Sequence, residues 1–175
     1  MLHFLKNNRG FSLAEILIVV ALLGILASVV LLNLGSSDVK AKEQALRSNL
    51  QAMRTAIDLY RGDHGRWPCS QGDYNYPCSD QEFKYKLTRY TRDDGRTSQT
   101  KNTTYKYGPY LKDFPIEPFS QTDSLTWSLG TERLKAAIAN QVDGSGGDGG
   151  WYYEPESGNI IANLGAAFPN EYANF

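Results

Sequence analysis

Two hydrophobic patterns follow one another in the first third of the chain. Residues 16–32 form an apolar run of 17 positions without a charge, diluted only by Gly24 and Ser28. About 20 apolar residues in a helix span the hydrocarbon core of a bilayer. Because Lys6 and Arg9 precede the run and no basic residue follows directly after it, the pattern predicts a membrane-spanning helix with a cytoplasmic N-terminus.

Beyond this run, the apolar residues narrow to one stripe with helical spacing. The stripe consists of Val39, Leu46, Leu50, Met53, Ile57 and Tyr60. Oppositely charged residues four positions apart, such as Glu43 and Arg47, support a helix whose other face meets water. No proline interrupts the pattern, and Gly62 is a natural stop. The two patterns together predict one helix from about Phe11 to Arg61, roughly 75 Å long.

One acidic residue, Glu15, lies inside the apolar N-terminal stretch. A carboxylate within a bilayer is costly unless it is paired or close to the interface. In one interpretation Glu15 reaches the headgroups and the segment is a plain signal anchor. In a second, a secretory signal is cleaved near residues 27–29, which match such a site poorly. In a third, a cut between Gly10 and Phe11 creates an amine, and a neighbouring subunit presents that amine to Glu15 as an ion pair.

The heptapeptide Arg9-Gly10-Phe11-Ser12-Leu13-Ala14-Glu15, with the apolar run behind it, resembles the leader of type IV prepilins and type II secretion pseudopilins. In that family a membrane peptidase cuts after the glycine and methylates the new N-terminal phenylalanine. The resemblance therefore implies that Gly10 is the cleavage residue, Phe11 the methylated N-terminus and Glu15 the assembly carboxylate. Loss of the two basic residues in the leader changes the formal net charge from -1 to -3.

The same resemblance implies a pilin-like α+β fold. In this fold a long N-terminal helix packs its outer half on a small antiparallel β-sheet. The expected parts are a cleaved leader (1–10), a transmembrane and filament-core helix (11–34), the amphipathic half of that helix (35–62) and an extracytoplasmic globular part (63–175).

The chain has two cysteines, Cys69 and Cys78, in a segment predicted as a variable loop over about 69–106. The family resemblance places this segment outside the cytoplasm, where two cysteines in one loop favour a disulfide. A metal site at the pair is disfavoured, because no second Cys or His cluster accompanies it.

Seven basic residues and four aromatic ones alternate between residues 83 and 106, with Asp93 and Asp94 as the only acids. The basic residues are Lys84, Lys86, Arg89, Arg92, Arg96, Lys101 and Lys106. Such a mixture can bind single-stranded nucleic acid through stacking and phosphate contacts. We favour the simpler interpretation of a solvated loop whose tyrosines pack on the sheet, and we do not expect a nucleic-acid partner.

The C-terminal half reads as loops and short strands. Residues 107–119, rich in proline, resemble a Gly-Pro-Tyr-Leu passage common in major pseudopilins, and we expect them to drape across the long helix. Ser124–Leu129 alternates as a strand, and Leu134–Val142 is predicted as a short helix. Aromatic and β-branched residues on both sides of Pro155–Gly158 predict a β-hairpin at about 150–163.

A glycine-rich loop that holds Asp143 and Asp148 precedes this hairpin. Carboxylates on such a loop can bind a hard cation, and major pseudopilins bind calcium on a loop in this region. Ca²⁺ is therefore the one candidate cofactor, although two carboxylates are few and the EF-hand pattern is absent. A flexible turn without a metal is the alternative, and no cofactor is required for the predicted function.

The sequence offers no support for an enzyme. Its only histidines are His3 and His64, and it has no nucleophile elbow, metalloprotease helix or dinucleotide fingerprint. The leading hypothesis is a periplasmic pseudopilus subunit that drives protein export by type II secretion. A type IV pilin for adhesion, motility or DNA uptake, and a membrane-tethered binding domain that does not polymerise, are the alternatives.

The resemblance also implies partners and a location. The partners are other copies of the chain in a helical polymer, the prepilin peptidase, the inner-membrane assembly platform with the minor pseudopilins, and the membrane before assembly. The location is the bacterial inner membrane with one span and a periplasmic C-terminal domain, and after assembly a filament in the periplasm or at the cell surface.

Overall fold

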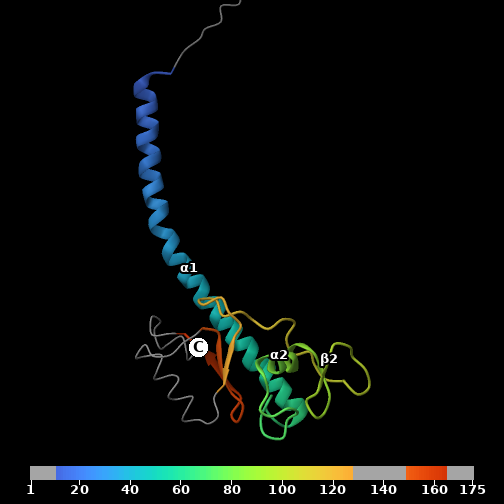
Figure 1. The fold of residues 1–175 in the computed structure, drawn as a ribbon. Helices are drawn as coiled ribbons and strands as arrows, with labels where there is room; N and C mark the ends of the chain where they lie inside the picture. Colours follow the sequence, from blue (N-terminus) through green and yellow to red (C-terminus); the bar gives the residue numbers. More distant parts are fainter. Residues whose placement is uncertain (1–10, 128–148, 165–175) are drawn as a thin grey trace, which may run out of the picture. The chain divides into compact units, whose positions relative to one another are not determined.

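The computed structural model of the protein describes residues 11–127 and 149–164, with the backbone alone described at residues 29–37. Its elements in chain order are α1 (Leu13–His64), α2 (Asp80–Thr88), β1 (Tyr90–Thr91), β2 (Thr97–Ser98), β3 (Leu125–Trp127), β4 (Trp151–Glu154) and β5 (Asn159–Ala162) (Figure 1). The chain divides into two compact units, Met1–Ala41 and Lys42–Phe175. The order of a long helix followed by short strands confirms the predicted pilin-like α+β fold.

The long helix α1 ends later than the sequence predicts. Gly62 lies inside α1, which continues to His64. Gly65 then takes φ +69°, and its N–H donates to the carbonyl of Arg61 at 2.8 Å. A residue in the left-handed conformation is a common end to a helix, and glycine adopts that conformation most easily. Gly65 therefore ends the helix in place of Gly62.

The second half of α1 provides one wall of the hydrophobic core. Leu46, Leu50, Met53 and Tyr60 are completely buried and Ile57 is nearly so, which confirms this part of the predicted stripe. Val39, which belongs to the other unit, is 48% exposed and does not share in this core. The buried stripe therefore begins at Leu46, about two helical turns after the predicted start at Val39.

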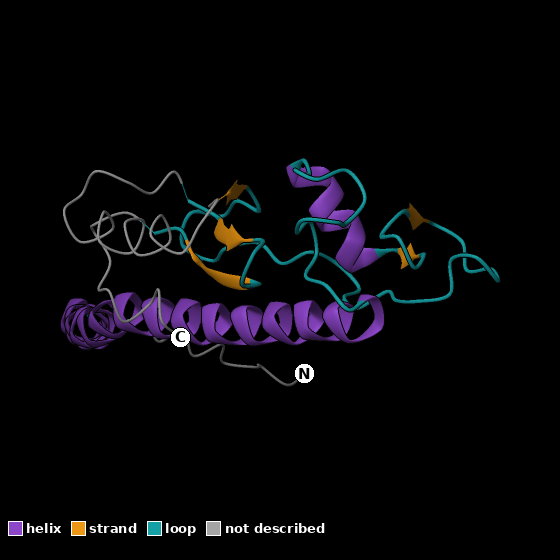
Figure 2. Ribbon diagram, turned by 90° about the horizontal axis from the view of Figure 1, so that it is seen from below, coloured by secondary structure: helices purple, strands orange, loops and turns teal. Residues whose placement is uncertain are grey.

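The small sheet and α2 lie on the same side of this second half of α1 (Figure 2). Both bring large side chains into one core, which includes Phe83 and Leu87 from α2 and Trp151, Tyr153 and Ile160 from the sheet. The ring of Phe83 lies 4.3 Å from that of Tyr153, centroid to centroid. Burial of these large aromatic rings helps to hold α2 and the sheet against the helix.

The three-stranded sheet has the order β3-β4-β5. Strands β4 and β5 are antiparallel, with Trp151 opposite Ala162, so the predicted hairpin is confirmed. Strand β3 runs parallel to β4, which makes the sheet mixed where an antiparallel one was expected. A parallel pair needs a crossover connection of a dozen or more residues, and residues 128–150 are long enough to supply it. The predicted helix at Leu134–Val142 lies outside the described residues.

The segment predicted as a variable loop contains regular structure. Helix α2 begins with a capping box, in which the Ser79 hydroxyl accepts the Glu82 N–H and the Glu82 carboxylate accepts the Ser79 N–H. A two-stranded ribbon of β1 and β2 follows it. The Ser-x-x-Glu spacing is itself a helix-start signal, so this helix was detectable from local sequence and was missed. The prediction of a loop over 69–106 is thus wrong for α2 and for the ribbon.

Candidate functional site

The first turn of α1 holds the predicted assembly carboxylate. The N–H of Ser12 donates to Oε2 of Glu15 at 2.8 Å, and the N–H of Ala14 donates to the Ser12 hydroxyl at 3.3 Å. Both bonds satisfy amides at the N-terminal end of the helix, as capping side chains do, although the Glu15 N–H itself donates to the Ser12 carbonyl. Ser12 was not singled out from the sequence, although its spacing to Glu15 carries the same signal as at α2. Glu15 is therefore a helix cap in the single chain, whatever else it binds.

The surroundings of Glu15 are apolar and uncovered. Phe11 is 85% exposed, and all described side chains from Phe11 to Ser28 are exposed. A hollow of about 330 Å³ beside Glu15 is lined by that residue and by Phe11, Ile16, Ile18 and Val19. Contiguous apolar surface of this kind marks a site that another molecule or a membrane covers. Gly10, the predicted cleavage residue, lies outside the described residues.

Among residues 11–127 and 149–164, no helix combines the length and the hydropathy that a membrane crossing needs. The membrane anchor over residues 11–34 stays a prediction.

The predicted disulfide joins Cys69 and Cys78, and both residues are buried. The loop between them carries Asp73, whose carboxylate is the centre of a buried polar cluster. It accepts hydrogen bonds from the Tyr60 hydroxyl at 3.0 Å and from the Cys69 N–H at 2.7 Å. It also pairs with the Lys86 ammonium at 3.1 Å. The sequence did not single out Asp73 or the burial of Lys86.

This cluster does not fit a metal ion. Ligand atoms of Cys69, Asp73 and Cys78 lie within 4.8 Å of one another, a spacing that a bound cation could use. Both sulfurs are bonded to each other, however, so neither is a thiolate ligand. The Lys86 ammonium already forms an ion pair with the carboxylate of Asp73, and its positive charge would repel a metal cation. The cluster is therefore a structural ion pair beside a disulfide.

The predicted calcium ligands Asp143 and Asp148 lie outside the described residues, so that site stays a prediction. A different carboxylate, Glu117, is fully buried. It accepts the N–H of Phe119 at 2.7 Å and the N–H and hydroxyl of Ser120, and that hydroxyl accepts the Gly150 N–H at 3.0 Å. Glu117 thereby fixes the start of the hairpin.

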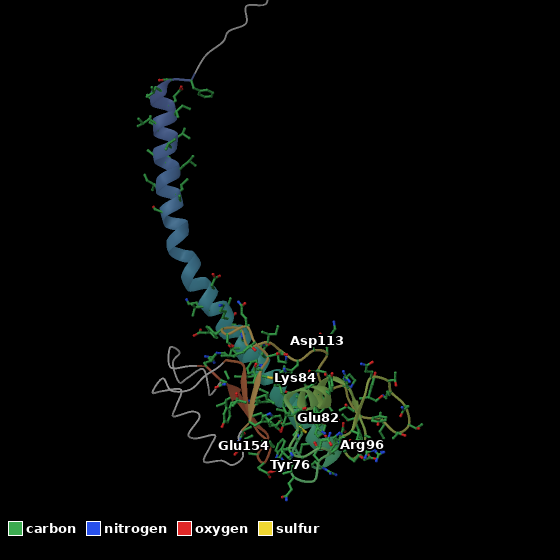
Figure 3. The ribbon with its side chains drawn as sticks, viewed as in Figure 1. Tyr76, Glu82, Lys84, Arg96, Asp113 and Glu154 are labelled. Atoms are coloured by element: carbon green, nitrogen blue, oxygen red, sulfur yellow. A yellow bond between two sulfur atoms is a disulfide. The ribbon has the colours of Figure 1, made fainter. Side chains whose placement is uncertain are left out.

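The basic residues between 84 and 106 are largely paired within the chain, and Figure 3 labels Lys84 and Arg96 among them. Lys84 pairs with Asp80 and Asp123, Arg92 and Arg96 pair with Asp94, and Lys106 pairs with Asp93. Arg89 stacks on the ring of Tyr85 at 3.2 Å and Lys101 lies over Tyr90. A strand of nucleic acid would need the aromatic faces that these cations cover. The arrangement favours the structural interpretation of this stretch.

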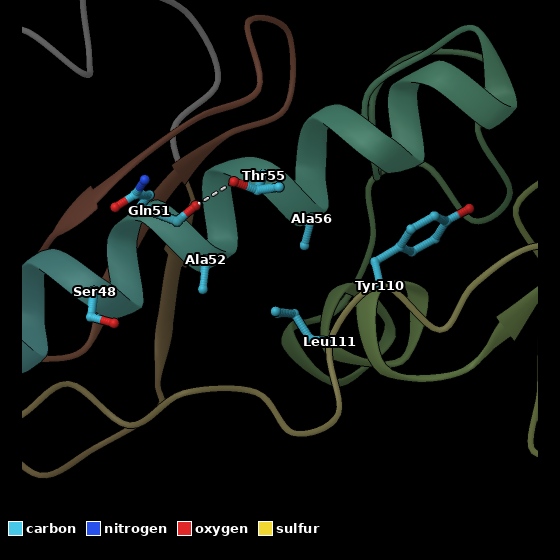
Figure 4. A pocket seen from close by; sticks show the side chains of 7 residues that line it. All are labelled: Ser48, Gln51, Ala52, Thr55, Ala56, Tyr110 and Leu111. Atoms are coloured by element: carbon cyan, nitrogen blue, oxygen red, sulfur yellow. Dashed lines mark hydrogen bonds between the residues drawn. The ribbon is translucent and has the colours of Figure 1, made fainter.

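The proline-rich passage lies along α1, as the sequence predicts. Asn49 donates to the carbonyl of Ile116 at 3.1 Å, and the Tyr110 hydroxyl donates to Asp63 at 2.8 Å. Tyr110 and Leu111 border an open groove of about 410 Å³ on the helix (Figure 4). Its other lining residues are Ser48, Gln51, Ala52, Thr55 and Ala56.

His64, the last residue of α1, is enclosed where α1, β1 and the proline-rich passage meet. Its Nε2 lies 2.9 Å from the Thr91 hydroxyl. The rings of Tyr60 and Tyr107 meet it edge-on, with centroids 4.0 and 5.0 Å away. Its Nδ1 is buried and has no hydrogen-bond partner in the described part of the chain. Burial lowers the pKa of this imidazole, because the charged form loses its hydration.

Comparison with known proteins identifies the kind of filament protein. Residues 5–31 match the model of the prokaryotic N-terminal methylation motif. The type II secretion system core protein G of Vibrio cholerae is 31% identical over 115 residues, which cover 66% of this chain and 68% of that protein. This chain belongs to the type II secretion system core protein G family. The protein of the same name from Aeromonas hydrophila is 30% identical over 65% of this chain and 69% of its own length.

Membership of this family confirms the kind of protein that the sequence predicts. The match to the Klebsiella pneumoniae core protein G, at 29% identity, extends over 91% of this chain and 96% of that protein. The protein is thus a pseudopilin, a structural subunit of the type II secretion pseudopilus, as the leading hypothesis predicted. No solved structure matches the chain significantly. The cleavage, methylation and assembly roles of single residues stay predictions.

Proposed function

We propose that this pseudopilin is the major subunit of a periplasmic filament that pushes folded proteins through an outer-membrane pore. The observation that carries the proposal is the position of Glu15. It is the one acid in the first turn of a helix whose described apolar side chains, through Ser28, are exposed. The described part of the chain leaves that surface uncovered, whereas a bundle of identical helices would bury it.

Processing prepares the subunit. The precursor waits in the inner membrane with its C-terminal part in the periplasm. The prepilin peptidase cuts after Gly10 and methylates Phe11. The apolar run of residues 16–32 supports the anchor, since its length is close to that of a bilayer-spanning helix. The assembly platform and the minor pseudopilins then receive the mature subunit.

Assembly exchanges one partner of Glu15 for another. In the single chain its carboxylate accepts the neutral N–H of Ser12. In the filament it pairs with the N-terminal amine of Phe11 from a neighbouring subunit. An ionised donor gives a stronger hydrogen bond than a neutral amide does. In apolar surroundings an unpaired charge is strongly unfavourable, so the pair fixes the axial register between subunits.

The test is the intact mass of the protein from its native membrane. We expect a mass that lacks residues 1–10 and carries one added methyl group. A full-length, unmethylated mass from a host that has the peptidase contradicts the proposed processing. In that case the chain is a tethered domain whose partners must be sought among ligands of residues 42–175.

A further inference from the structure

The Asp73 hub, consisting of Tyr60, Cys69, Asp73, Lys86 and Gly95, connects four separate segments of the chain. Asp73 receives the hydroxyl of Tyr60 from α1 and the ammonium of Lys86 from α2. Lys86 also donates to the carbonyl of Gly95, in the turn between β1 and β2, at 2.7 Å. One carboxylate therefore links the disulfide loop, both helices and the ribbon.

The hub holds a charge pair that is closed off from water. The side chain of Asp73 is 0% exposed and that of Lys86 is 2% exposed. Burial lowers the pKa of the Lys86 ammonium, and Asp73 opposes that shift. A buried charge that loses its partner is strongly destabilising. If Asp73 moves away, Lys86 must therefore reach water or release its proton, and in either case the ammonium that holds the turn at Gly95 is lost.

The disulfide keeps Asp73 in place. The residues between Cys69 and Cys78 form a short closed loop. The loop is held at two points: the Cys69 N–H donates to Asp73, and the Tyr74 N–H donates to the carbonyl of Asp94, in the turn between β1 and β2, at 3.0 Å. Cys69 itself has φ 60°, a conformation that residues other than glycine rarely adopt. Tertiary contacts must hold it there.

We propose that the Cys69–Cys78 disulfide is a redox-controlled clasp of this pseudopilin. Closed, it places Asp73 on Lys86 and fixes the β1–β2 turn against α1. Reduced by a dithiol, the S–S bond gains two electrons and two protons and becomes two thiols, while the dithiol becomes a disulfide. The loop then withdraws Asp73, and residues 69–78 and 92–96 open together, whereas β4 and β5 stay packed through Trp151 and Tyr153.

The clasp determines in which compartment the subunit can reach its final structure. Disulfides form in the periplasm and are reduced in the cytoplasm. The turn between β1 and β2 becomes fixed only after the disulfide has formed. The subunit therefore has its final surface there only outside the cytoplasm. This consequence rests on the proposed filament function, whereas the opening itself is a property of the purified protein.

The experiment is hydrogen exchange, followed by mass spectrometry, on the full chain in detergent with and without dithiothreitol. The chain has two cysteines, so the reductant acts at this bond alone. We expect exchange to accelerate at least tenfold in peptides that cover 69–78 and 92–96, and less than twofold in peptides that cover 151–162. Equal acceleration in all peptides would show that the disulfide stabilises the whole domain without acting on this region in particular. No acceleration would show that the disulfide does not hold the loop and the turn in place. Either result overturns the clasp.

Two variants separate the bond from the charge. Cys69→Ser/Cys78→Ser should reproduce the reduced pattern without reductant. Asp73→Asn keeps the disulfide and the size of the side chain but removes the negative charge beside Lys86, and should accelerate exchange in residues 92–96 at least tenfold. If the oxidised Asp73→Asn protein protects residues 92–96 as well as the parent does, the ion pair is not the link and the clasp is refuted. The mass measurement of processing is independent of these outcomes.

Discussion

The two units of the chain use their apolar residues in opposite ways. In Met1–Ala41, large apolar side chains such as Leu17 and Leu26 are each 64% exposed. In Lys42–Phe175, Leu46, Leu50 and Met53 are completely buried. Both sets lie on the same helix, α1. The comparison indicates that one part of the helix stabilises its own domain, while the other leaves its apolar surface for membrane or neighbouring subunits.

The substitution with the largest expected effect removes the carboxylate of Glu15 in the first unit. Glu15→Ala leaves the core of the second unit untouched, so the purified protein should keep the thermal midpoint of the parent. In cells it should form no filaments, a loss of at least a hundredfold in sheared polymer, because the register-setting ion pair is gone. Immunoblots of sheared filaments measure the loss.

Ser12→Ala is the matched control for Glu15→Ala. It removes one cap hydrogen bond and leaves the carboxylate, at a cost of about 1 kcal/mol in helix stability, so filaments should persist. Normal filaments from Glu15→Ala would refute the proposed pairing of Glu15 with Phe11.

The corresponding change in the second unit is Asp73→Ala. It leaves Lys86 buried without its ion-pair partner, and we expect the free energy of unfolding to fall by about 3–5 kcal/mol. Urea titration of the full chain in detergent measures it. Lys106→Ala breaks an exposed ion pair and should leave the urea midpoint unchanged. Equal effects of the two substitutions would show that burial of the hub does not raise the cost of breaking its ion pair.

Sequence reasoning succeeded where the signal is local or periodic. The spacing of Leu46 to Tyr60 predicted the buried face, and the turn at Pro155–Gly158 predicted the hairpin to the residue. The leader motif pointed to the family. These features depend on residues within a turn or two of one another, so their physics can be read along the chain.

Sequence reasoning failed where contacts between residues far apart in the sequence determine the structure. Asp73 and Lys86 belong to different segments, and nothing in their spacing shows that both are buried. The parallel pairing of β3 with β4 joins strands that are far apart along the chain, and hydrophobic alternation does not encode such a pairing. The missed caps at Ser12 and Ser79 are a different matter, since both carry a local signal that the periodic pattern overshadowed.

The end of α1 offers a smaller and cleaner test, with two glycines three residues apart. Gly65 has φ +69° and Gly62 is inside the helix, and a Cβ at either position meets no atom within 4 Å. Gly65→Ala should therefore destabilise the domain by about 1 kcal/mol through backbone strain alone. Gly62→Ala should stabilise it by up to about 1 kcal/mol, because alanine is the better helix former. Urea midpoints of the two variants should shift in opposite directions. Shifts of the same sign would indicate that the helix ends at Gly62, as the sequence predicts.

The smallest expected effect is the pH dependence that His64 gives to the second unit. The charged groups that face it are Asp63 and Asp73, which raise its pKa, and Arg66 and Lys86, which lower it. Burial outweighs them, so the pKa in the folded protein is below the ordinary value of 6.5. The unfolded chain then binds the proton more readily, and the stability that neutral His64 contributes is complete above pH 6.5 and declines as pH falls.

His64→Gln cannot take up that proton. The difference in unfolding free energy between parent and variant should therefore shrink as pH falls from 7.5 to 5, measured by urea titration of both proteins at each pH. Other groups titrate equally in the two proteins and cancel in the difference. A difference that grows on acidification would mean that the ring of tyrosines around His64 stabilises the imidazolium, and that cation–aromatic attraction exceeds the cost of burial.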